Sequence, residues 1–572
     1  MNNFKRVNTI FGWVTFLIAM AVYIMTLEQS VSLWDCGEFI SASYRLQVVH
    51  PPGAPLFLML GRIFTMFATP ATNEVAIAVN MLSAVASAAA VMFTFWITTH
   101  FAKKILRIGL NANLVDLGST IAIIGSGLVA ALSVTFMDTF WFSAIEAEVY
   151  AGSSCFMALA FWAILKWEKV KDEPTSDRWI ILIAYIVGLG IGLHLLNILV
   201  VPAILLYYFF NKYDASAANV IKASVIGLGS IALLQWGIIP GTPMVASNFD
   251  LFFVNTLGLP FNSGVLAFML VMIATIVCSL MYTHTGNKVV GTLALVGFLM
   301  IMLLSGWSSF LVSIVKIGII AGTIYAVYTS QKTSKRTITN TVILCLGFIM
   351  IGFSSYAMVV IRSIAEPAIN MNDPQDAQSL LSYINREQYG SRPLVYGSYW
   401  NARLTAIDEG KTQYRRSEEG TYQVVGTKQE PVYDKKYSTI LPRMGDMSEK
   451  SKYYPIWSGM EDMFMSINSL EQKVKADPTN SDLRTQLETA EMTKPKFSNN
   501  LTFLFKYQIG WMYIRYFMWN FVGRQNDLQN VTGSSQQGNW ISGIDAFDEW
   551  RLQAPSEVPA QMEYNKARNT YY

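Results

Sequence analysis

The sequence predicts an all-α polytopic membrane domain, followed by an α+β domain that lies outside the membrane. Of the 572 residues, 52% are hydrophobic and only 14% are charged. The apolar residues form uninterrupted runs of about 20 residues, the length that a helix needs to cross a bilayer. After residue 362 the chain becomes polar, with short aromatic and β-branched segments between turns. A net charge of +3, without a basic patch interleaved with aromatic residues, gives no sign of nucleic-acid binding.

Apolar runs between polar breaks predict eleven transmembrane helices. They are residues 8–27, 73–99, 118–137, 151–167, 179–194, 195–210, 219–239, 264–283, 289–304, 308–328 and 340–361. The stretch 179–210 is too long for one helix, and it is divided near His194, where several glycines permit a break. Residues 54–69 are shorter and contain Arg62, which favours an interfacial or re-entrant helix.

The basic residues predict the orientation of these helices. With a cytoplasmic N-terminus, fifteen basic residues fall on the cytoplasmic side, and only Arg45 and Arg62 fall in the short outer loops. The fifteen are Lys5, Arg6, Lys103, Lys104, Arg107, Lys166, Lys169, Lys171, Arg178, Lys212, Lys222, Lys288, Lys332, Lys335 and Arg336. This asymmetry follows the positive-inside rule, so everything after Arg362 is expected outside.

The expected domains are a transmembrane domain at 1–362 and an extracytoplasmic domain at 363–572. Within the second, residues 460–494 predict two amphipathic helices separated by a turn at 477–480. Residues 501–521 are rich in aromatic side chains but contain Lys506 and Arg515, a mixture that favours a membrane-surface helix.

Four acidic residues of the two expected outer loops are candidates for chemistry. Asp35 and Glu38 follow the first span, and their spacing places them on one helix face. Glu146 and Glu148 lie in the loop 138–150, and only one of them is expected to face the same cavity. Carboxylates beside hydrocarbon are costly unless they face protein or a polar cavity. Desolvation would raise the pKa of such a group and make it a useful base; alternatively, these acids pair with nearby arginines and hold helix ends together.

Several cations are candidates for binding an anionic substrate near the outer surface. His50 precedes a Pro-Pro-Gly turn that fixes its backbone. His194 either contacts a phosphate or is a hydrogen-bonded interhelical histidine. Arg362 ends the last span and either extends to the lipid headgroups or binds a lipid phosphate. Arg45 lies in the first outer loop.

The aromatic residues Trp34 and Tyr150 flank the acidic residues of the two outer loops. Such residues commonly anchor a protein at the membrane interface, and stacking on a sugar is the alternative. The four cysteines lack CxxC spacing, so neither a zinc site nor a redox motif is predicted.

Five segments carry a resemblance to a known family. They are SLWDCGEFISASYRLQVVHPPGAPLF (32–57), FSAIEAEVYAGSS (142–154), GLHLLNIL (192–199), YQIGWMYIRYFMWNFVGRQND (507–527) and GNWISGI (538–544). Together they resemble a large family of Bacteroidota membrane proteins, formerly of unknown function, that is related to protein O-mannosyltransferases and belongs to the GT-C glycosyltransferases. The resemblance implies a multi-pass enzyme of the bacterial inner membrane with a periplasmic active site. It would transfer a sugar, mannose, from a polyprenyl-phosphate donor to Ser or Thr hydroxyls of exported proteins.

The resemblance also assigns roles to the acidic residues. In GT-C enzymes an acid of the first outer loop is the catalytic base, and the matching position here is Asp35, with Glu38 beside it. Glu146 and Glu148 match the acids of the second loop. Related mannosyltransferases have adjacent Asp and Glu in the first loop, whereas two residues separate them here. The individual roles of Asp35 and Glu38 therefore stay open. Some GT-C enzymes use a divalent metal, so the metal requirement is open as well. Family members continue past the point where this chain ends.

The expected mechanism is an inverting displacement. Cations hold the donor phosphate, with Arg362, His194 and Arg45 as candidates, and Asp35 takes the proton from the attacking hydroxyl. The alternatives are a transferase that modifies a glycolipid such as lipid A, a non-catalytic envelope scaffold and a lipid transporter. A transporter predicts charges near the middle of the bilayer, where only Lys316 lies deep within an expected span; no inverted repeat is visible either.

Overall fold

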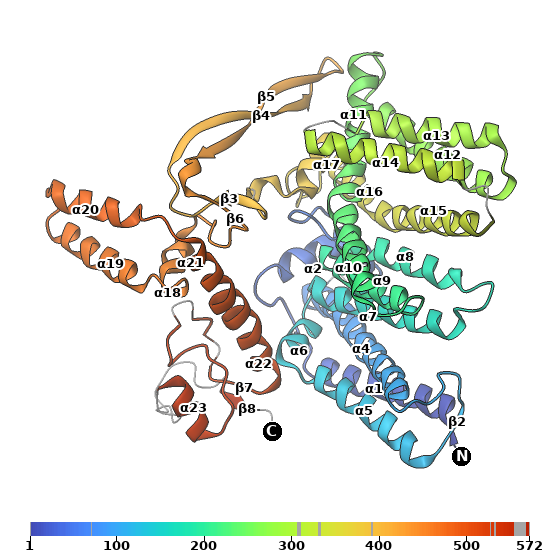
Figure 1. The fold of residues 1–572 in the computed structure, drawn as a ribbon, viewed down its shortest axis with the longest axis horizontal. Helices are drawn as coiled ribbons and strands as arrows, with labels where there is room; N and C mark the ends of the chain where they lie inside the picture. The colour runs from blue at the N-terminus through green and yellow to red at the C-terminus, as the bar shows by residue number, and fades with distance from the viewer. Residues whose placement is uncertain are drawn as a thin grey trace. The chain divides into compact units, whose positions relative to one another are not determined.

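The computed structural model describes residues 2–69, 71–305, 310–329, 333–390, 393–526, 528–530, 533–553 and 568–570 (Figure 1). The chain forms two compact units. The first comprises Met1–Gln388 and Tyr414–Gln423, and the second comprises Tyr389–Gln413 and Val424–Tyr572.

The first unit is built almost entirely of helices. In chain order they are α1 (Phe4–Met25), α2 (Cys36–Arg45), α3 (Pro55–Thr65), α4 (Thr72–Ile105), α5 (Leu117–Thr135), α6 (Asp138–Ala144), α7 (Val149–Val170), α8 (Asp177–Ile191), η1 (Leu195–Leu199), α9 (Val200–Phe210), α10 (Ala217–Ala232), η2 (Leu233–Ile238), α11 (Gly241–Asn255), α12 (Ser263–Thr285), α13 (Lys288–Leu303), α14 (Phe310–Thr329), α15 (Thr333–Phe353), η3 (Ser354–Tyr356), α16 (Ala357–Ile364), α17 (Ala377–Ile384) and η4 (Glu387–Tyr389). Two short antiparallel strands, β1 (Asn2–Asn3) and β2 (Leu114–Val115), hold the start of α1.

Seven helical stretches among the described residues are long and apolar enough to cross a membrane. They are Phe4–Met25, Thr72–Ile105, Leu117–Thr135, Val149–Val170, Ala217–Asn255, Ser263–Thr285 and Arg336–Ile364. The expected count of eleven is therefore not confirmed, although each expected run overlaps a helix. The difference arises from short apolar helices such as α13, and from the expected span 308–328, whose first residues lie outside the described part. Lys332, used in the orientation argument, lies outside it too. The GT-C type and the orientation stay predictions.

The break expected near His194 separates α8 from α9. Helix α8 ends at Ile191, and Gly192 is its C-cap. The His194 Nδ1 atom then accepts a hydrogen bond from the Leu196 backbone N–H at 3.1 Å, which caps the short helix η1. The short helix α3, at Pro55–Thr65, coincides with the stretch for which an interfacial or re-entrant helix was expected.

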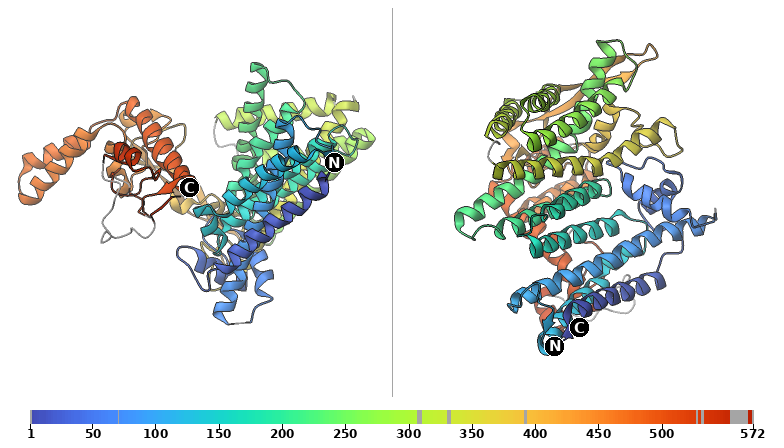
Figure 2. Two further views of the ribbon diagram at one scale, coloured as in Figure 1. Left: turned by 90° about the horizontal axis from the view of Figure 1, so that it is seen from below. Right: turned by 90° about the vertical axis from the view of Figure 1, so that its right-hand side faces the viewer.

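Helix α4 is the centre of the N-terminal helix bundle. It packs against α1, α5 and α7, which run beside it in Figure 2. Its buried face includes the small residues Ala84, Ser87 and Ala88. Small side chains allow membrane helices to approach closely and gain van der Waals contact.

Glycine allows an equally close approach of α8 to α15. A Cβ atom added to Gly188 would lie only 2.5 Å from the carbonyl oxygen of Ile349. No side chain fits in that space, so the two backbones meet directly.

The second unit combines short sheets with helices. Its elements are β3 (Tyr396–Ser398), β4 (Leu404–Arg416), β5 (Tyr422–Tyr433), η5 (Lys435–Tyr437), β6 (Ser438–Ile440), η6 (Glu449–Tyr453), α18 (Tyr454–Trp457), α19 (Glu461–Ala476), α20 (Ser481–Glu491), α21 (Phe497–Thr502), the π-helix η7 (Phe503–Arg515), α22 (Tyr516–Phe521), β7 (Gly523–Arg524), α23 (Asp545–Leu552) and β8 (Asn569–Thr570). Strand β3 pairs with β6, β4 with β5, and β7 with β8. Helices α19 and α20 form the hairpin expected at 460–494.

The helix expected at 501–521 is present, and its arginine has a clear structural task. Arg515 is buried between the rings of Trp511 and Trp519, at 4.4 and 4.5 Å from their centroids. Its Nη1 atom donates to the Gly538 carbonyl at 2.7 Å, and the Trp519 indole donates to the Asn539 carbonyl at 2.7 Å. These bonds join 507–527 and 538–544, two of the five segments that carry the family resemblance. The membrane-surface location of the helix stays a prediction.

Candidate active site

The stretch 31–55 forms α2 and the turn that leads into α3. Asp35 is the N-cap residue of α2, and Glu38 lies in the first turn of that helix. Negative side chains are favoured at this end because they face the positive end of the helix dipole. The Asp35 side chain is 57% exposed. Trp34, directly before it, is 90% exposed and has a left-handed backbone with φ of 62°.

Glu38 holds His50 with both carboxylate oxygens. The Oε1 atom accepts the His50 backbone N–H at 2.8 Å, and Oε2 accepts the ring Nδ1 at 2.6 Å. The opposite ring atom, Nε2, lies 4.0 Å from Asp35 Oδ2. The bond to Glu38 raises the pKa of His50, against the opposing effect of burial. His50 is therefore a fixed imidazole with increased cationic character between two carboxylates.

Residues far along the chain hold the turn around His50 in place. The Tyr383 hydroxyl of α17 donates to the Val49 carbonyl at 2.5 Å. Val48 forms a bridge with the segment at Asn370. Arg362 donates to the carbonyls of Arg45 and Leu46, at the C-terminal end of α2. These contacts fix the stretch from the C-terminal end of α2 to His50.

The second outer loop brings a buried carboxylate to the same place. Glu148 is the N-cap residue of α7, where its Oε2 atom accepts the Val149 N–H at 3.3 Å. The Cys36 thiol lies 3.9 Å from its other oxygen. Glu148 is only 7% exposed, and this burial, with the charge of Asp35, raises its pKa to about 7. Glu148 therefore holds its proton to a higher pH than an ordinary carboxyl group does.

These groups line one cavity of 470 Å³. Of the residues proposed from the sequence, five contribute to its wall: Asp35, His50, Glu148, Tyr150 and His194. The rings of Tyr150 and His194 lie 5.4 Å apart between centroids. The turn Pro51–Gly53 and residues 195–199 complete much of the remaining wall. A site assembled from α2, α7 and η1 thus collects acids, histidines and an aromatic ring.

The other candidates lie outside the lining of this cavity. Glu146 accepts a hydrogen bond from the Ser32 hydroxyl at 2.7 Å and is buried. The guanidinium of Arg362 is directed to backbone carbonyls of α2. Arg45 and Trp34 are exposed and do not line it. Glu38 acts on the cavity only through His50.

Two polar lining residues, Arg386 and Gln235, are not predicted from the sequence. Arg386 follows α17 at a left-handed position with φ of 55°, and Gln235 lies on the π-helix η2. Burial lowers the pKa of His194, and the charge of Arg386 lowers it further. No pattern in the sequence marks Arg386, because it reaches the cavity only through the packing of α17 on the turn at residues 49–53.

Asp35, Glu38 and His50 form the one group among the described residues that could together hold a metal ion. One ligand atom from each lies within 4.8 Å of the others. However, the 2.6 Å contact between Glu38 and His50 is a direct hydrogen bond, which already occupies one carboxylate oxygen and one ring nitrogen. The His50 Nε2 atom, 4.0 Å from Asp35 Oδ2, remains available as a ligand while this bond is intact, so the bond does not exclude a metal ion.

The cavity thus gathers acids and histidines within a helical unit that contains the seven candidate membrane spans. Residues 35–217 match the family described as "Protein O-mannosyl-transferase TMEM260 N-terminal domain". The matched range begins at Asp35 and contains all five of the proposed residues that line the cavity. Residues 390–505 match a family of unknown function, DUF8416.

Two curated relatives carry the same name. The chain is 26% identical over 239 residues to "Protein O-mannosyl-transferase tmem260" of Dictyostelium discoideum, which covers 38% of this chain and 26% of the relative. It is 28% identical over 183 residues to "Protein O-mannosyl-transferase TMEM260" of Mus musculus, covering 32% of this chain and 22% of the relative. The chain is therefore related to protein O-mannosyl-transferases, although the alignments span only about a quarter of those relatives.

Proposed function

We propose that this protein is a membrane glycosyltransferase that transfers mannose from a polyprenyl-phosphate donor to Ser or Thr hydroxyls of exported proteins. The observation that carries the proposal is the position of the cavity. Asp35, His50, Glu148, Tyr150 and His194 meet there, and all lie within residues 35–217, which match the O-mannosyl-transferase domain.

Asp35 is the proposed general base. Its exposed carboxylate accepts the proton of the acceptor hydroxyl while that oxygen forms a bond to the anomeric carbon. The bond from the anomeric carbon to the phosphate oxygen breaks, and its electron pair stays on the phosphate. The products are an O-glycoside with inverted configuration and the polyprenyl phosphate. No acid is needed for the leaving group, because a phosphate carries the developing charge well.

The donor phosphate is proposed to lie near His50, His194 and Arg386. His50 and Arg386 bring positive charge to the cavity wall, and the raised pKa of His50 favours its charged form. Arg45 and Arg362, the other candidates from the sequence, lie outside that wall. Arg362 is instead proposed to hold the C-terminal end of α2.

The remaining acids have separate proposed tasks. Glu38 is a positioning residue, since both of its oxygens are bonded to His50. The raised pKa of Glu148 favours its protonated form, which can donate a hydrogen bond to a sugar hydroxyl as well as accept one. Tyr150 offers a ring for stacking on the sugar. No step of this mechanism uses a metal ion.

The proposed cellular setting rests on the distribution of basic residues for the orientation and on the family resemblance for the bacterial membrane. With a cytoplasmic N-terminus, the cavity is proposed to lie at the periplasmic face of the bacterial inner membrane, where exported proteins would present their hydroxyls. The lipid tail of the donor would enter from the bilayer. The second unit is proposed to bind or present the acceptor protein.

The test in cells is mass spectrometry of exported proteins. A deletion strain is complemented with the wild type, with Asp35→Asn or with Asp116→Asn. Asp116 is a matched control, because it is also an N-cap aspartate but belongs to α5 and is absent from the cavity lining. A hexose on Ser or Thr should be lost with Asp35→Asn and retained with Asp116→Asn. An unchanged glycoproteome in the deletion strain would reject the proposed function.

A further inference from the structure

A second cavity, of 540 Å³, lies among the basic ends of α1, α4, α7 and α8. Five cationic side chains line it: Lys5, Lys103, Lys166, Lys169 and Arg178. No described acid is among its lining residues. None of the residues proposed for sugar transfer takes part in it.

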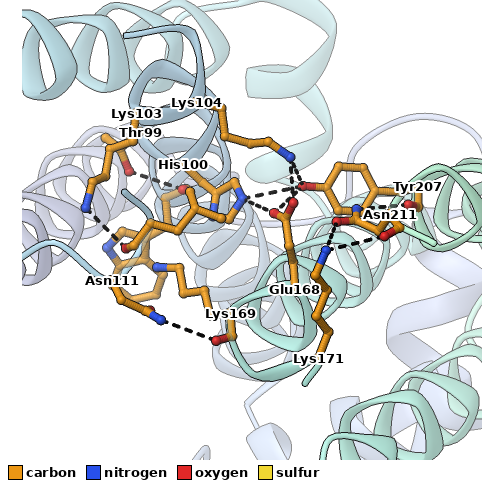
Figure 3. Close-up of polar contacts among 12 residues, drawn as sticks. Thr99, His100, Lys103, Lys104, Asn111, Glu168, Lys169, Lys171, Tyr207 and Asn211 are labelled. Atoms are coloured by element: carbon orange, nitrogen blue, oxygen red, sulfur yellow. Dashed lines mark hydrogen bonds and ion pairs between the residues drawn. The ribbon is translucent and has the colours of Figure 1, made fainter. Parts of the chain in front are cut away.

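Glu168, which lies between the lining residues Lys166 and Lys169 in the sequence, is bonded to residues of other helices. Glu168 accepts hydrogen bonds from His100 at 2.7 Å and from Tyr207 at 2.6 Å on one oxygen, and from Lys104 at 2.6 Å on the other (Figure 3). These three donors occupy both carboxylate oxygens of Glu168, which therefore forms no ion pair with the five lining cations, although its charge still acts on Lys169 from a distance.

The lining cations have few internal partners in the described structure. Lys103 donates to the carbonyls of Leu110 and Ala112 at 3.2 and 2.8 Å. Lys166 lies 4.7 Å from the ring centroid of Trp162. Among the described residues, none of the five lining cations forms an ion pair. Like charges gathered around one cavity repel each other, and a bound anion would remove that cost.

The rest of the wall suits an amphipathic ligand. Trp96, Trp162 and Trp179 contribute apolar surface, and such residues favour the boundary between lipid and water. The Asn8 side-chain oxygen is buried without a hydrogen-bond partner, and it can accept a hydrogen bond from a hydroxyl group. The cavity thus offers cations for a phosphate, an acceptor for a hydroxyl and apolar surface for an acyl chain.

The two cavities lie toward opposite ends of α7, and we call the 470 Å³ cavity that contains Asp35 and Glu148 the acidic cavity. On α7, Val149 lines the acidic cavity and Lys166 lines the basic one. Seventeen residues of α-helix separate them, or about 25 Å at 1.5 Å per residue. That length is close to the hydrocarbon thickness of a bilayer. Basic pockets between membrane helices at such a surface are suited to anionic lipid headgroups.

We propose that this basic pocket binds the phosphate headgroup of an anionic phospholipid from the leaflet opposite the acidic cavity. The lipid phosphate lies among Lys5, Lys166, Lys169 and Arg178, and the ligand links the N-terminal end of α1 to the ends of α7 and α8. A soluble phosphate compound shares the recognition chemistry, but the tryptophans and the location at a bilayer surface favour the lipid. The site does not depend on the proposed sugar transfer.

The test is lipid binding to the purified full-length protein, followed by native mass spectrometry. Phosphatidylglycerol is titrated against the wild type, Lys166→Gln/Lys169→Gln and the control Lys212→Gln/Lys222→Gln, with phosphatidylcholine as the neutral probe. The control lysines are exposed and outside the pocket. Two lost charges should weaken phosphatidylglycerol binding about thirtyfold, since each is worth roughly a factor of five. The control should change it less than threefold.

Three results would overturn the proposal. They are equal binding of phosphatidylglycerol to the pocket variant and the wild type, equal binding of phosphatidylcholine and phosphatidylglycerol to the wild type, and displacement of the lipid by millimolar inorganic phosphate. The last would assign the pocket to a soluble phosphate. If the double variant does not fold, the single variant Lys169→Gln and a salt titration of the wild type serve instead. Both should then weaken lipid binding, and a lack of effect of either would count against the proposal.

Discussion

Replacing Glu38 by Gln tests how His50 is held. The amide oxygen of Gln can still accept the His50 backbone N–H, the bond of 2.8 Å in the native protein. The amide nitrogen cannot accept from the ring Nδ1, so the 2.6 Å charge-assisted bond is lost. The substitution therefore removes one interaction and keeps the local shape.

The size of the effect follows from the kind of bond that is lost. Hydrogen bonds to charged groups contribute about 1.5–3 kcal/mol. Glu38 and His50 have side chains that are only 23% and 27% exposed, so water replaces the bond poorly. A loss of that size corresponds to about a tenfold to hundredfold fall in kcat/KM. The loss of Glu38 also lowers the pKa of His50, so the deficit should grow as the pH rises and the imidazole of the variant loses its proton first.

The assay is transfer from synthetic polyprenyl-phosphate mannose to a Ser/Thr peptide by the protein in nanodiscs, measured from pH 5.5 to 8.5. Asp116→Asn again serves as the control and should change kcat/KM less than threefold. Wild-type activity of Glu38→Gln across this range would refute the positioning role. A deficit that is constant with pH would refute the electrostatic part of the argument.

Three further predictions concern stability and positioning. The pKa of Glu148 is about 7 in the folded protein and 4.5 in the unfolded chain, so the free energy of unfolding should fall by up to about 3 kcal/mol as the pH rises from 4.5 to 7. Thermal unfolding of Glu148→Gln should lack this pH-dependent loss of stability. The same pH dependence in the variant and the wild type would contradict the burial argument. Gly188→Ala should destabilise the protein by about 1–3 kcal/mol, because its new methyl group meets the Ile349 carbonyl. Gly125→Ala should change the melting temperature little, because nothing lies within 4 Å of the added methyl group. Equal effects of the two substitutions would contradict the close approach of α8 and α15. Arg362→Ala should lower kcat and thermal stability without raising the KM for the donor, because it frees the end of α2; a selective rise in that KM would instead support direct phosphate binding.

The sequence predicted the helices well because their signal is local. Apolar runs follow directly from the need to cross hydrocarbon, and the glycines before His194 allowed the break after α8. The number of spans was less accessible, because a run such as 289–304 is compatible with either a complete span or a shorter buried helix. Packing of neighbouring helices determines that outcome, and it leaves no periodic mark in one sequence.

The candidate site was predictable where it lies in short, unusual segments. Asp35, His50 and Glu148 belong to such segments, and the topology placed them near one another. The partners of the candidate cations were not predictable. Arg362 ends an apolar run and resembles a phosphate-binding arginine, but its donors satisfy carbonyl groups of α2. Arg386 lies in an ordinary polar segment and reaches the cavity only through tertiary packing.

The basic pocket is another feature that the sequence alone did not predict, because tertiary packing forms it. In the sequence, Lys5, Lys166 and Arg178 indicate only which helix ends face the cytoplasm. Only the fold gathers them around one cavity, because α1, α7 and α8 place their basic ends side by side. Residues with one general role can thus acquire a specific one through packing.

The most direct test of the central claim is the rate of mannose transfer by purified Asp35→Asn. The asparagine keeps the size of the aspartate, whose side chain makes no capping hydrogen bond, but it cannot take a proton from the acceptor hydroxyl. General bases contribute about 10²–10⁴-fold, so the variant should lose at least a hundredfold in kcat while its melting temperature stays within a few degrees of the wild type. Wild-type kcat in Asp35→Asn would contradict the assignment of Asp35 as the base, and with it the proposed mechanism.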